Sequence, residues 1–337
     1  MKRPLLTLLA TAMLFSPIAA VTAQADDVRS RMIRFGYGLN ESSNQGRAAK
    51  LFAEEVAKAS EGKLKMRTFA AASLGSDDQM QSALMGGAQE MMVGSTATLV
   101  GITKEMAVWD TPFLFSNEQQ ADAVLDGPVG RQVMDKLEEK GLVGLVYWEN
   151  GFRNMTNNAR PISKLEDFSG IKLRVMPNPV FLETFKLMGA NAVPLPFSEL
   201  FTALETKAVD GQENPFNTIL SSKFYEVQKY LTVTNHVYSP WIVTASKRWW
   251  DGLSATEQGI ILEAAKKARD FERQDTRAEA AKALAQLEEN GMQVNQISAE
   301  EMQRMRERAQ PAIQQVVDTV GQPLFDQVQA ELAKAAN

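Results

Sequence analysis

The sequence predicts an α/β protein built from two domains, and three observations support this prediction. Strands and helices alternate through the first two-thirds of the chain, which is the rhythm of a largely parallel sheet. A mature chain of about 310 residues exceeds the usual size of one hydrophobic core. Two stretches, Ala83–Glu90 and Ala203–Asp210, both read A-L-x-x-x-A-x-acid, as expected of two domains of similar build.

The N-terminus has the pattern of a secretory signal peptide. Lys2 and Arg3 precede an almost wholly apolar run over residues 5–20, and residues 23–25 supply the small side chains that signal peptidase recognises. The run is short and contains a proline, which disfavours a membrane-spanning helix. We therefore expect residues 1–25 to be cleaved and the mature protein to be exported to the periplasm.

The elements of the first two-thirds follow from hydrophobic alternation and helix-capping residues. Ser43 is suited to capping a helix over residues 44–60, and Ser76 begins another with Asp77 and Asp78, whose carboxylates complement a helix N-terminus. Buried or alternating segments predict strands at Met32–Tyr37, Leu64–Phe69, Met91–Val93, Leu142–Trp148 and Ile171–Val175.

The last third of the chain is predicted to be almost entirely helical. One helix extends from Glu257 to Glu289, and a second covers residues 299–320. A helix longer than ~25 residues is unusual in a globular protein. It is either a solvated outer helix or a rigid strut that crosses both domains.

The composition disfavours most enzyme classes. The chain has no cysteine and one histidine, so the common zinc sites, disulfides and thiol nucleophiles are excluded. No G-x-S-x-G or G-x-x-x-x-G-K-[ST] motif is present, and we interpret His236 as structural. The net charge of −5 argues against nucleic acid as a partner. We expect no cofactor and no metal.

One glycine-containing turn superficially resembles a dinucleotide-binding fingerprint. It is Gly36–Glu41, which follows a strand and precedes a helix. Glu41 stands where the third glycine belongs and would face a pyrophosphate with negative charge. We interpret the segment as a structural turn that exposes Asn40 at the carboxyl end of a strand, where ligands of open α/β sheets bind.

Two arginines and one asparagine are candidates for binding a small anion. Arg174 lies inside an apolar strand, and Arg153 follows another strand among glycine and aromatic residues. A buried arginine is costly unless it is paired, and its planar fork fits a carboxylate. The alternative is an internal pair with Asp or Glu. Asn214, in the turn after a helix, offers both a donor and an acceptor to carboxylate and hydroxyl groups.

Six segments in order resemble the extracytoplasmic solute receptors of tripartite ATP-independent periplasmic (TRAP) transporters, of the dicarboxylate-binding-protein type. The resemblance covers essentially the whole mature chain. The segments are Ser73–Asp77, Pro112–Phe115, Trp148–Arg153, Gly170–Val175, Val209–Pro215 and Ser222–Tyr230.

The resemblance implies a periplasmic-binding-protein fold with crossing strands and a long bracing helix. Domain I would comprise residues 26–150 with about 239–278, and domain II residues 151–238 with about 279–332. The ligand would lie in the cleft between them. The protein would act as a monomer, closing around a carboxylate ligand and docking on the membrane subunits of the transporter.

The resemblance also implies roles for individual residues. Arg174 matches the arginine that grips the ligand carboxylate, Asn214 the amide that fixes it, and Arg153 a second arginine at the ligand. Asn40 would line the cleft. Weaker candidates for hydroxyl or apolar contacts are Ser95, Thr96, Trp148, Phe197, Asn217, Tyr238 and Trp241.

The sequence favours a sugar acid such as glucuronate or galacturonate, because several polar candidates would meet hydroxyl groups. A C4-dicarboxylate remains the alternative and would use one arginine for each carboxylate. Proteins of other classes, a secreted enzyme or a ligand-loaded sensor, also remain open; the enzyme is disfavoured because no catalytic set is found.

Overall fold

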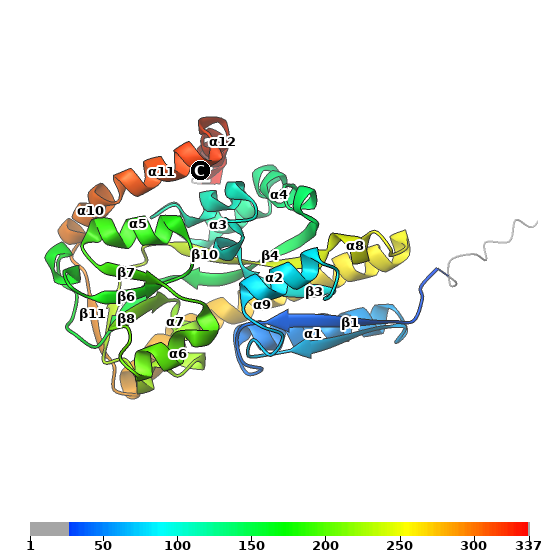
Figure 1. Cartoon of the computed structure of the whole chain (residues 1–337), viewed down its shortest axis with the longest axis horizontal. Helices are drawn as coiled ribbons and strands as arrows, with labels where there is room; N and C mark the ends of the chain where they lie inside the picture. Colours follow the sequence, from blue (N-terminus) through cyan, green and yellow to red (C-terminus); the bar gives the residue numbers. More distant parts are fainter. Residues whose placement is uncertain (1–26, 336–337) are drawn as a thin grey trace, which may run out of the picture.

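The computed structural model describes residues 27–335, which form two sheets with helices on both faces (Figure 1). The predicted signal peptide lies outside the described residues. The first sheet has the order β2-β1-β3-β10-β4, and the second β11-β9-β5-β8-β6-β7. Strands of the first sheet are β1 (Arg31–Tyr37), β2 (Leu64–Phe69), β3 (Met91–Ser95), β4 (Leu142–Phe152) and β10 (Tyr238–Ser246). Strands of the second are β5 (Asn154–Asn157), β6 (Lys172–Val175), β7 (Asn191–Pro194), β8 (Gly211–Asn214), β9 (Tyr230–Val233) and β11 (Gln293–Gln296).

The α-helices alternate with the strands and then dominate the C-terminal third. They are α1 (Asn44–Ala59), α2 (Asp77–Met85), α3 (Glu118–Leu125), α4 (Pro128–Asp135), α5 (Pro179–Met188), α6 (Phe197–Glu205), α7 (Phe216–Ser221), α8 (Lys247–Trp250), α9 (Ala255–Glu289), α10 (Ala299–Arg308), α11 (Gln310–Val320) and α12 (Gln322–Ala335). Short 3-10 helices are η1 (Thr96–Leu99), η2 (Lys104–Asp110), η3 (Glu138–Lys140), η4 (Leu165–Phe168) and η5 (Phe224–Glu226). No helix among residues 27–335 is both long and apolar enough to cross a membrane.

Three segments cross between the sheets. Strand β4 leads into β5 through the single residue Arg153, and β9 leads into β10 through residues 234–237. Helix α9 packs against α1 and β4 on the first sheet and against α7 on the second, and then enters β11. In Figure 1 it runs from the yellow end beside α8 to the orange end near β11. The long helix is therefore the strut, not a solvated outer helix.

Predicted and observed elements agree closely where caps and alternation are clear. Ser43 caps α1 by accepting from the Gly46 N–H, and Ser76 and Ser254 form capping boxes at α2 and α9. The single helix predicted over residues 299–320 was wrong: α10 ends at Arg308 and α11 begins at Gln310. Pro311 lies in the first turn of α11, where its missing N–H is tolerated because the first N–H groups of a helix have no partner within the helix. Inside one continuous helix it would remove a backbone hydrogen bond and clash with the preceding turn.

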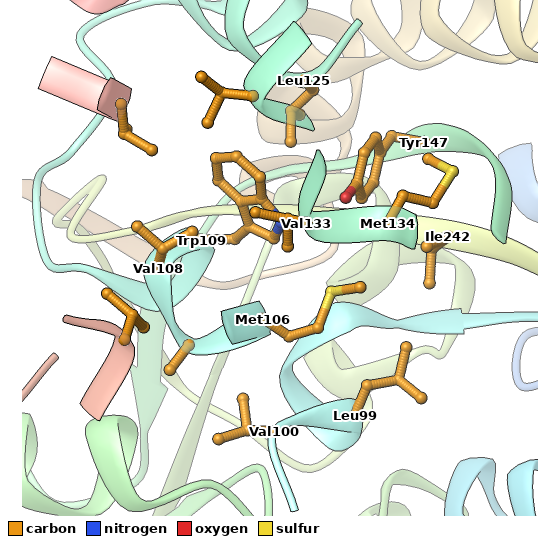
Figure 2. Close-up of a cluster of buried hydrophobic side chains, with 14 of the residues drawn as sticks. Leu99, Val100, Met106, Val108, Trp109, Leu125, Val133, Met134, Tyr147 and Ile242 are labelled. Atoms are coloured by element: carbon orange, nitrogen blue, oxygen red, sulfur yellow. The ribbon is translucent and has the colours of Figure 1, made fainter. Parts of the chain in front are cut away.

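Each sheet has a hydrophobic core on both of its faces. Successive residues of β10 enter different cores, because strand side chains alternate: Ile242 packs with Trp109 and Tyr147, and Val243 with Phe35 and Trp148. Figure 2 shows the first of these clusters around Trp109. The Trp109 and Tyr147 rings meet edge to face, 6.0 Å between centroids.

The C-terminal helices return across the molecule. Helix α10 packs against α5, α11 against α5 and η2, and α12 against α3 and α4 of the first half (Figure 1). The apolar side chains Val316, Leu324 and Val328 belong to the same core as Trp109. The domain boundaries expected from the sequence stay a prediction; the C-terminal helices contact both halves.

The two similar sequence stretches form the same turn after corresponding helices. In each turn the carbonyl of the first alanine, Ala83 or Ala203, accepts from the N–H groups five and six residues later. These bonds are 2.8 and 3.3 Å in the first turn, and 2.9 and 3.3 Å in the second. Gly87 and Lys207 occupy equivalent left-handed positions, with φ of +74° and +59°. Helices α2 and α6 begin the same number of residues before these turns, so Asp77 corresponds to Phe197.

Candidate ligand-binding site

A cavity of about 660 Å³, measured out to its mouth, lies between the two halves. The first half contributes Gly38, Leu39, Gln45, Ala72, Ser76, Asp77, Asp78, Ser95, Thr98 and Trp241. The second half contributes Arg174, Met176, Pro177, Pro196, Phe197, Ser198, Asn214 and Thr218, while Asn150 and Arg153 come from the crossing strand. An enclosed hollow between two halves, lined by charged, amide and hydroxyl side chains together with apolar ones, is a typical place for a small-molecule site.

Arg174 is a buried cation without an acidic partner among the described residues. Its side chain lies in β6 and is 1% exposed. Nε donates to the Leu195 carbonyl at 2.8 Å, and Nη1 has no hydrogen-bond partner. Burial lowers the pKa of Arg174 to about 10, although Glu213 and Asp77 act in the opposite direction. The guanidinium is therefore still charged at neutral pH and lines the cavity with unused donors.

Arg153 has an internal partner, the buried Glu213. Nε of Arg153 donates to one oxygen of the Glu213 carboxylate, and Nη2 donates to the other at 2.8 Å and to the Glu213 carbonyl at 2.5 Å. The guanidinium carbon lies 5.6 Å from the centroid of the Phe181 ring. Nη1 is buried without a hydrogen-bond partner, and Arg153 is one of the residues that line the cavity. The ion pair expected as the alternative to ligand binding is thus present for Arg153.

His236 completes the buried network behind Arg153. Nε2 lies 3.1 Å from Glu213, and Nδ1 lies 2.8 Å from the Thr234 hydroxyl. Burial lowers the pKa of His236 in spite of Glu213, so the ring is neutral, donates from Nε2 and accepts at Nδ1. For Glu213, burial opposes ionisation, but Arg153 and His236 outweigh it and its pKa lies below the ordinary value. His236 does not line the cavity.

A chain of buried amides and a hydroxyl orients Asn214. Asn214 Nδ2 donates to Gln212 Oε1 at 2.5 Å, Gln212 Nε2 donates to the Thr156 hydroxyl, and that hydroxyl donates to Gln228 Oε1. Because each donor meets an acceptor in turn, the orientation of Asn214 is fixed. Asn214 lines the cavity, and its second Nδ2 hydrogen has no hydrogen-bond partner among the described residues.

The opposite wall of the cavity carries carboxylates. Asp77 Oδ2 accepts from the Ser95 N–H at 3.0 Å, and burial raises the pKa of Asp77 to about 6. Asp78, the next residue of α2, is exposed and also lines the cavity. The sequence identified both as helix-start residues, which is correct for α2, but missed that this helix start faces the cavity.

Six of the eleven residues predicted for the site line the cavity together. They are Arg153, Arg174, Asn214, Ser95, Phe197 and Trp241. Polar residues that the sequence analysis missed include Gln45, Asp77, Asp78, Thr98, Asn150 and Thr218. The similarity of the two turns could have identified Asp77. It corresponds in position to Phe197, which was among the predicted site residues.

Five predicted residues lie outside the cavity lining. Trp148 packs on Phe35 in a hydrophobic core, and the buried Tyr238 hydroxyl lies 3.3 Å from Glu149. Thr96 donates to the Pro240 carbonyl at 3.2 Å. Asn217 lines a separate hollow and donates to the Thr276 carbonyl in α9. Asn40 donates through Nδ2 to the Ser221 carbonyl at 2.6 Å.

Several of these bonds join the two halves around the cavity. The Asn40 bond runs from the loop after β1 to the end of α7. Asn178, at the start of α5, donates to the Ala97 carbonyl and to Asp110, both at 2.8 Å. The described structure is therefore a closed form, in which the two halves meet around the cavity.

Two halves, crossing strands, a bracing helix and an interdomain cavity define a receptor that closes around a small molecule. The chain belongs to the family described as bacterial extracellular solute-binding proteins, family 7, which matches residues 35–319. The family consists of substrate-binding receptors and not of enzymes, and it includes the TRAP periplasmic binding proteins.

Three relatives illustrate the family. The sugar acid binding protein DctPAm of Advenella mimigardefordensis, solved with galactonate, is 50% identical, with a TM-score of 0.90 over 92% of this chain and 100% of that chain. The 2,3-diketo-L-gulonate-binding periplasmic protein YiaO of Escherichia coli is 36% identical over 82% of this chain and 85% of its own. A TRAP periplasmic solute binding protein of Sulfurospirillum deleyianum, solved with succinate, is 31% identical, with a TM-score of 0.86 over 90% and 99%.

Proposed function

We propose that the protein binds a sugar acid, a uronate or an aldonate, and delivers it to the membrane subunits of a TRAP transporter. The observation that carries this proposal is the buried guanidinium of Arg174, which faces the cavity without an acidic partner. Burying an unpaired charge is costly, and a ligand carboxylate would remove that cost. Each charge-assisted hydrogen bond contributes roughly 1.5–3 kcal/mol.

The contacts of the two arginines favour a ligand with one carboxylate over a ligand with two. A C4-dicarboxylate that used one arginine per carboxylate would need Arg153 to be free, but its Nε and Nη2 are bonded to Glu213. Nη1 of Arg153 and Nη1 of Arg174 both lack partners, so the two arginines are suited to holding the same carboxylate. Asn214 supplies a further donor from the adjacent strand β8.

The rest of the wall suits a polyhydroxylated chain. Neutral polar side chains provide donors and acceptors for hydroxyl groups: Gln45, Ser95, Thr98, Asn150 and Thr218. Phe197 and Trp241 offer apolar faces for the C–H side of a sugar. The relatives that bind galactonate and diketogulonate support a sugar acid, whereas a more distant one binds succinate.

Export and closure complete the proposal. A cleaved N-terminal signal peptide would place the mature monomer in the periplasm, where the family acts. The two halves would act as the two domains, with the boundaries expected from the sequence. A ligand that contacts both halves stabilises the closed form, because only contacts with both favour closure over the open state.

The experiment is a thermal-shift screen of purified mature protein, stripped of carried-over ligand, against uronates, aldonates, aldarates and C4-dicarboxylates. At about 100 times its Kd, a ligand adds roughly 2.7 kcal/mol of stability. We expect a shift with sugar acids that is lost in Arg174→Met and kept in Arg248→Met, a control at an exposed arginine of α8. No shift with any acid overturns the proposal.

A further inference from the structure

The cavity has Arg174 on one wall and Asp77 and Asp78 on the opposite wall, and none of these three forms an ion pair within residues 27–335. Arg174 makes no salt bridge, and neither do Asp77 and Asp78, although many other charged side chains of the described chain do. The cation projects from β6 of one half, and the carboxylates from the first turn of α2 in the other. A ligand held at Arg174 therefore extends toward two negative charges.

Asp77 has one oxygen that is used within the protein and one that is free. Oδ2 accepts from the Ser95 N–H at 3.0 Å, and Oδ1 has no hydrogen-bond partner among the described residues. A Cβ built on Gly38 would lie 3.8 Å from this Oδ1 and 3.9 Å from the Phe197 ring, and both Gly38 and Phe197 line the cavity. Oδ1 is therefore directed to the cavity, where it can accept a hydrogen bond.

We propose that Asp77, assisted by Asp78, makes the site selective for acids with a single carboxylate. Its free oxygen accepts hydrogen bonds from ligand hydroxyl groups, and its charge excludes a second carboxylate at the far end of the ligand. The inference rests on the proposed function, since it assumes that the first carboxylate is bound at Arg174. It separates aldonates and uronates, which fit, from aldarates and C4-dicarboxylates, which do not.

The two acids contribute unequally. Asp78 is exposed, so solvent screens its charge, whereas Asp77 is held in the wall by its bond to Ser95. Two like charges a few ångströms apart in a partly buried site repel by an amount that corresponds to on the order of 100-fold in Kd. Hydroxyl groups instead gain a charge-assisted bond to the same oxygen.

The test uses galactonate and galactarate, six-carbon acids that differ in having one or two carboxylates. Kd is measured by calorimetry at pH 7.5 for the wild type, Asp77→Asn, Asp78→Asn and Glu288→Gln. The last variant removes an exposed negative charge at the end of α9, away from the cavity. Asparagine keeps an oxygen for the Ser95 N–H and is nearly isosteric, so Asp77→Asn is expected to fold.

We expect the wild type and Glu288→Gln to bind galactonate about 100-fold more tightly than galactarate. In Asp77→Asn the ratio should fall at least tenfold, and in Asp78→Asn by less. An unchanged ratio in Asp77→Asn, together with loss of galactonate binding in Arg174→Met, overturns this inference but leaves the proposed function standing. If no sugar acid binds the wild type, the proposed function is overturned, and this inference is overturned with it. Tighter binding of an amino acid than of galactonate would mean that Asp77 holds an ammonium group, which also overturns the inference.

Discussion

Arg153 and Glu213 form a fully buried ion pair in which one guanidinium nitrogen, Nη2, donates both to the carboxylate and to the main-chain carbonyl of its partner. Arg174 is the next arginine in the same wall and has no such partner. The two arginines, both of which line the cavity, therefore differ in their contacts. Arg153 holds the crossing strand to β8, whereas Nη1 of Arg174 is left without a hydrogen-bond partner.

Substitution of each arginine by methionine should separate these roles in the ligand-free protein. Arg153→Met leaves Glu213 buried without its main partner, and we expect a loss of about 3–5 kcal/mol in the free energy of unfolding. Arg174→Met removes an unpaired buried charge, so stability should be unchanged or higher. Urea unfolding with Arg248→Met as the control measures both. Equal losses in the two variants would make Arg174 a structural residue.

The bond from Asn40 to Ser221 should act as a latch on the closed form. Asn40→Ala removes this bond between the halves without touching the cavity wall, so we expect affinity to fall about 2–10-fold, the effect of roughly 0.5–1.5 kcal/mol. Stopped-flow binding should place the loss in the dissociation rate, because the latch forms after the ligand enters. A slower association with unchanged dissociation would contradict this role.

Glu272 in α9 should give the ligand-free protein an unusual pH dependence. It is fully buried, accepts from the Glu149 N–H at 2.8 Å and from the Thr276 hydroxyl at 2.7 Å, and burial raises its pKa to about 8. The folded state therefore binds a proton that the unfolded state releases near 4.5. Stability is lost as pH rises from about 4.5 to about 8.

Unfolding midpoints between pH 5 and 8.5 check this prediction. The wild-type midpoint should fall as pH rises across that window, and Glu272→Gln should have a shallower slope. Some slope will remain, because burial also raises the pKa of Glu149 to about 7 in the same direction. His236 acts oppositely, since its lowered pKa costs stability as pH falls below about 6.5. The same slope in both proteins would exclude a titrating Glu272.

Asp77 should make dicarboxylate binding depend on pH. Its pKa is raised to about 6, and the charged groups that act on it are Asp78 on the same helix and Arg174 on β6. Galactarate should bind more tightly at pH 5.5 than at pH 7.5, because Asp77 gains a proton while the ligand and Arg174 keep their charges. Calorimetry at both pH values, with Asp77→Asn as the reference, tests this: the variant should show a smaller change.

Trp241 should report ligand binding by its fluorescence. It lines the cavity, whereas Trp109 and Trp148 are fully buried in the cores and Trp249 and Trp250 lie around α8. Titration with galactonate should change the emission of the wild type, and this change should be largely lost in Trp241→Phe while calorimetry still detects binding. A full signal in the variant would place the response at another tryptophan.

Much of the fold could be predicted because its signals are local. Caps such as Ser43 and Ser76, and alternating segments such as 64–69, mark elements to within a few residues. The arginines were found because a charge within an apolar segment needs a partner. The division between the last helices does not follow from the periodicity, because the helical pattern is continuous on both sides of Pro311.

The site was only partly predictable, because sequence position does not tell which way a side chain faces. Trp148 and Trp241 pair across β4 and β10, yet only Trp241 reaches the cavity. The Tyr238 side chain belongs to a hydrophobic core, and the Thr96 hydroxyl donates a hydrogen bond to the Pro240 carbonyl. Asp77 was assigned one role, starting a helix, although it has a second one. Such choices are decided by packing between segments far apart in the chain.

The two helices that precede the repeated turns, α2 and α6, contribute separate parts of the cavity wall. Helices α2 and α6, which both lead into such a turn, place their first residues at the cavity from opposite halves, so Asp77 and Asp78 at one helix start lie across from Phe197 and Ser198 at the other. Each helix is followed by its own copy of the turn and then by its own strand, β3 or β8. Charge preference and size preference can therefore diverge independently during evolution, and an altered specificity can be engineered at one helix start while the other is left untouched.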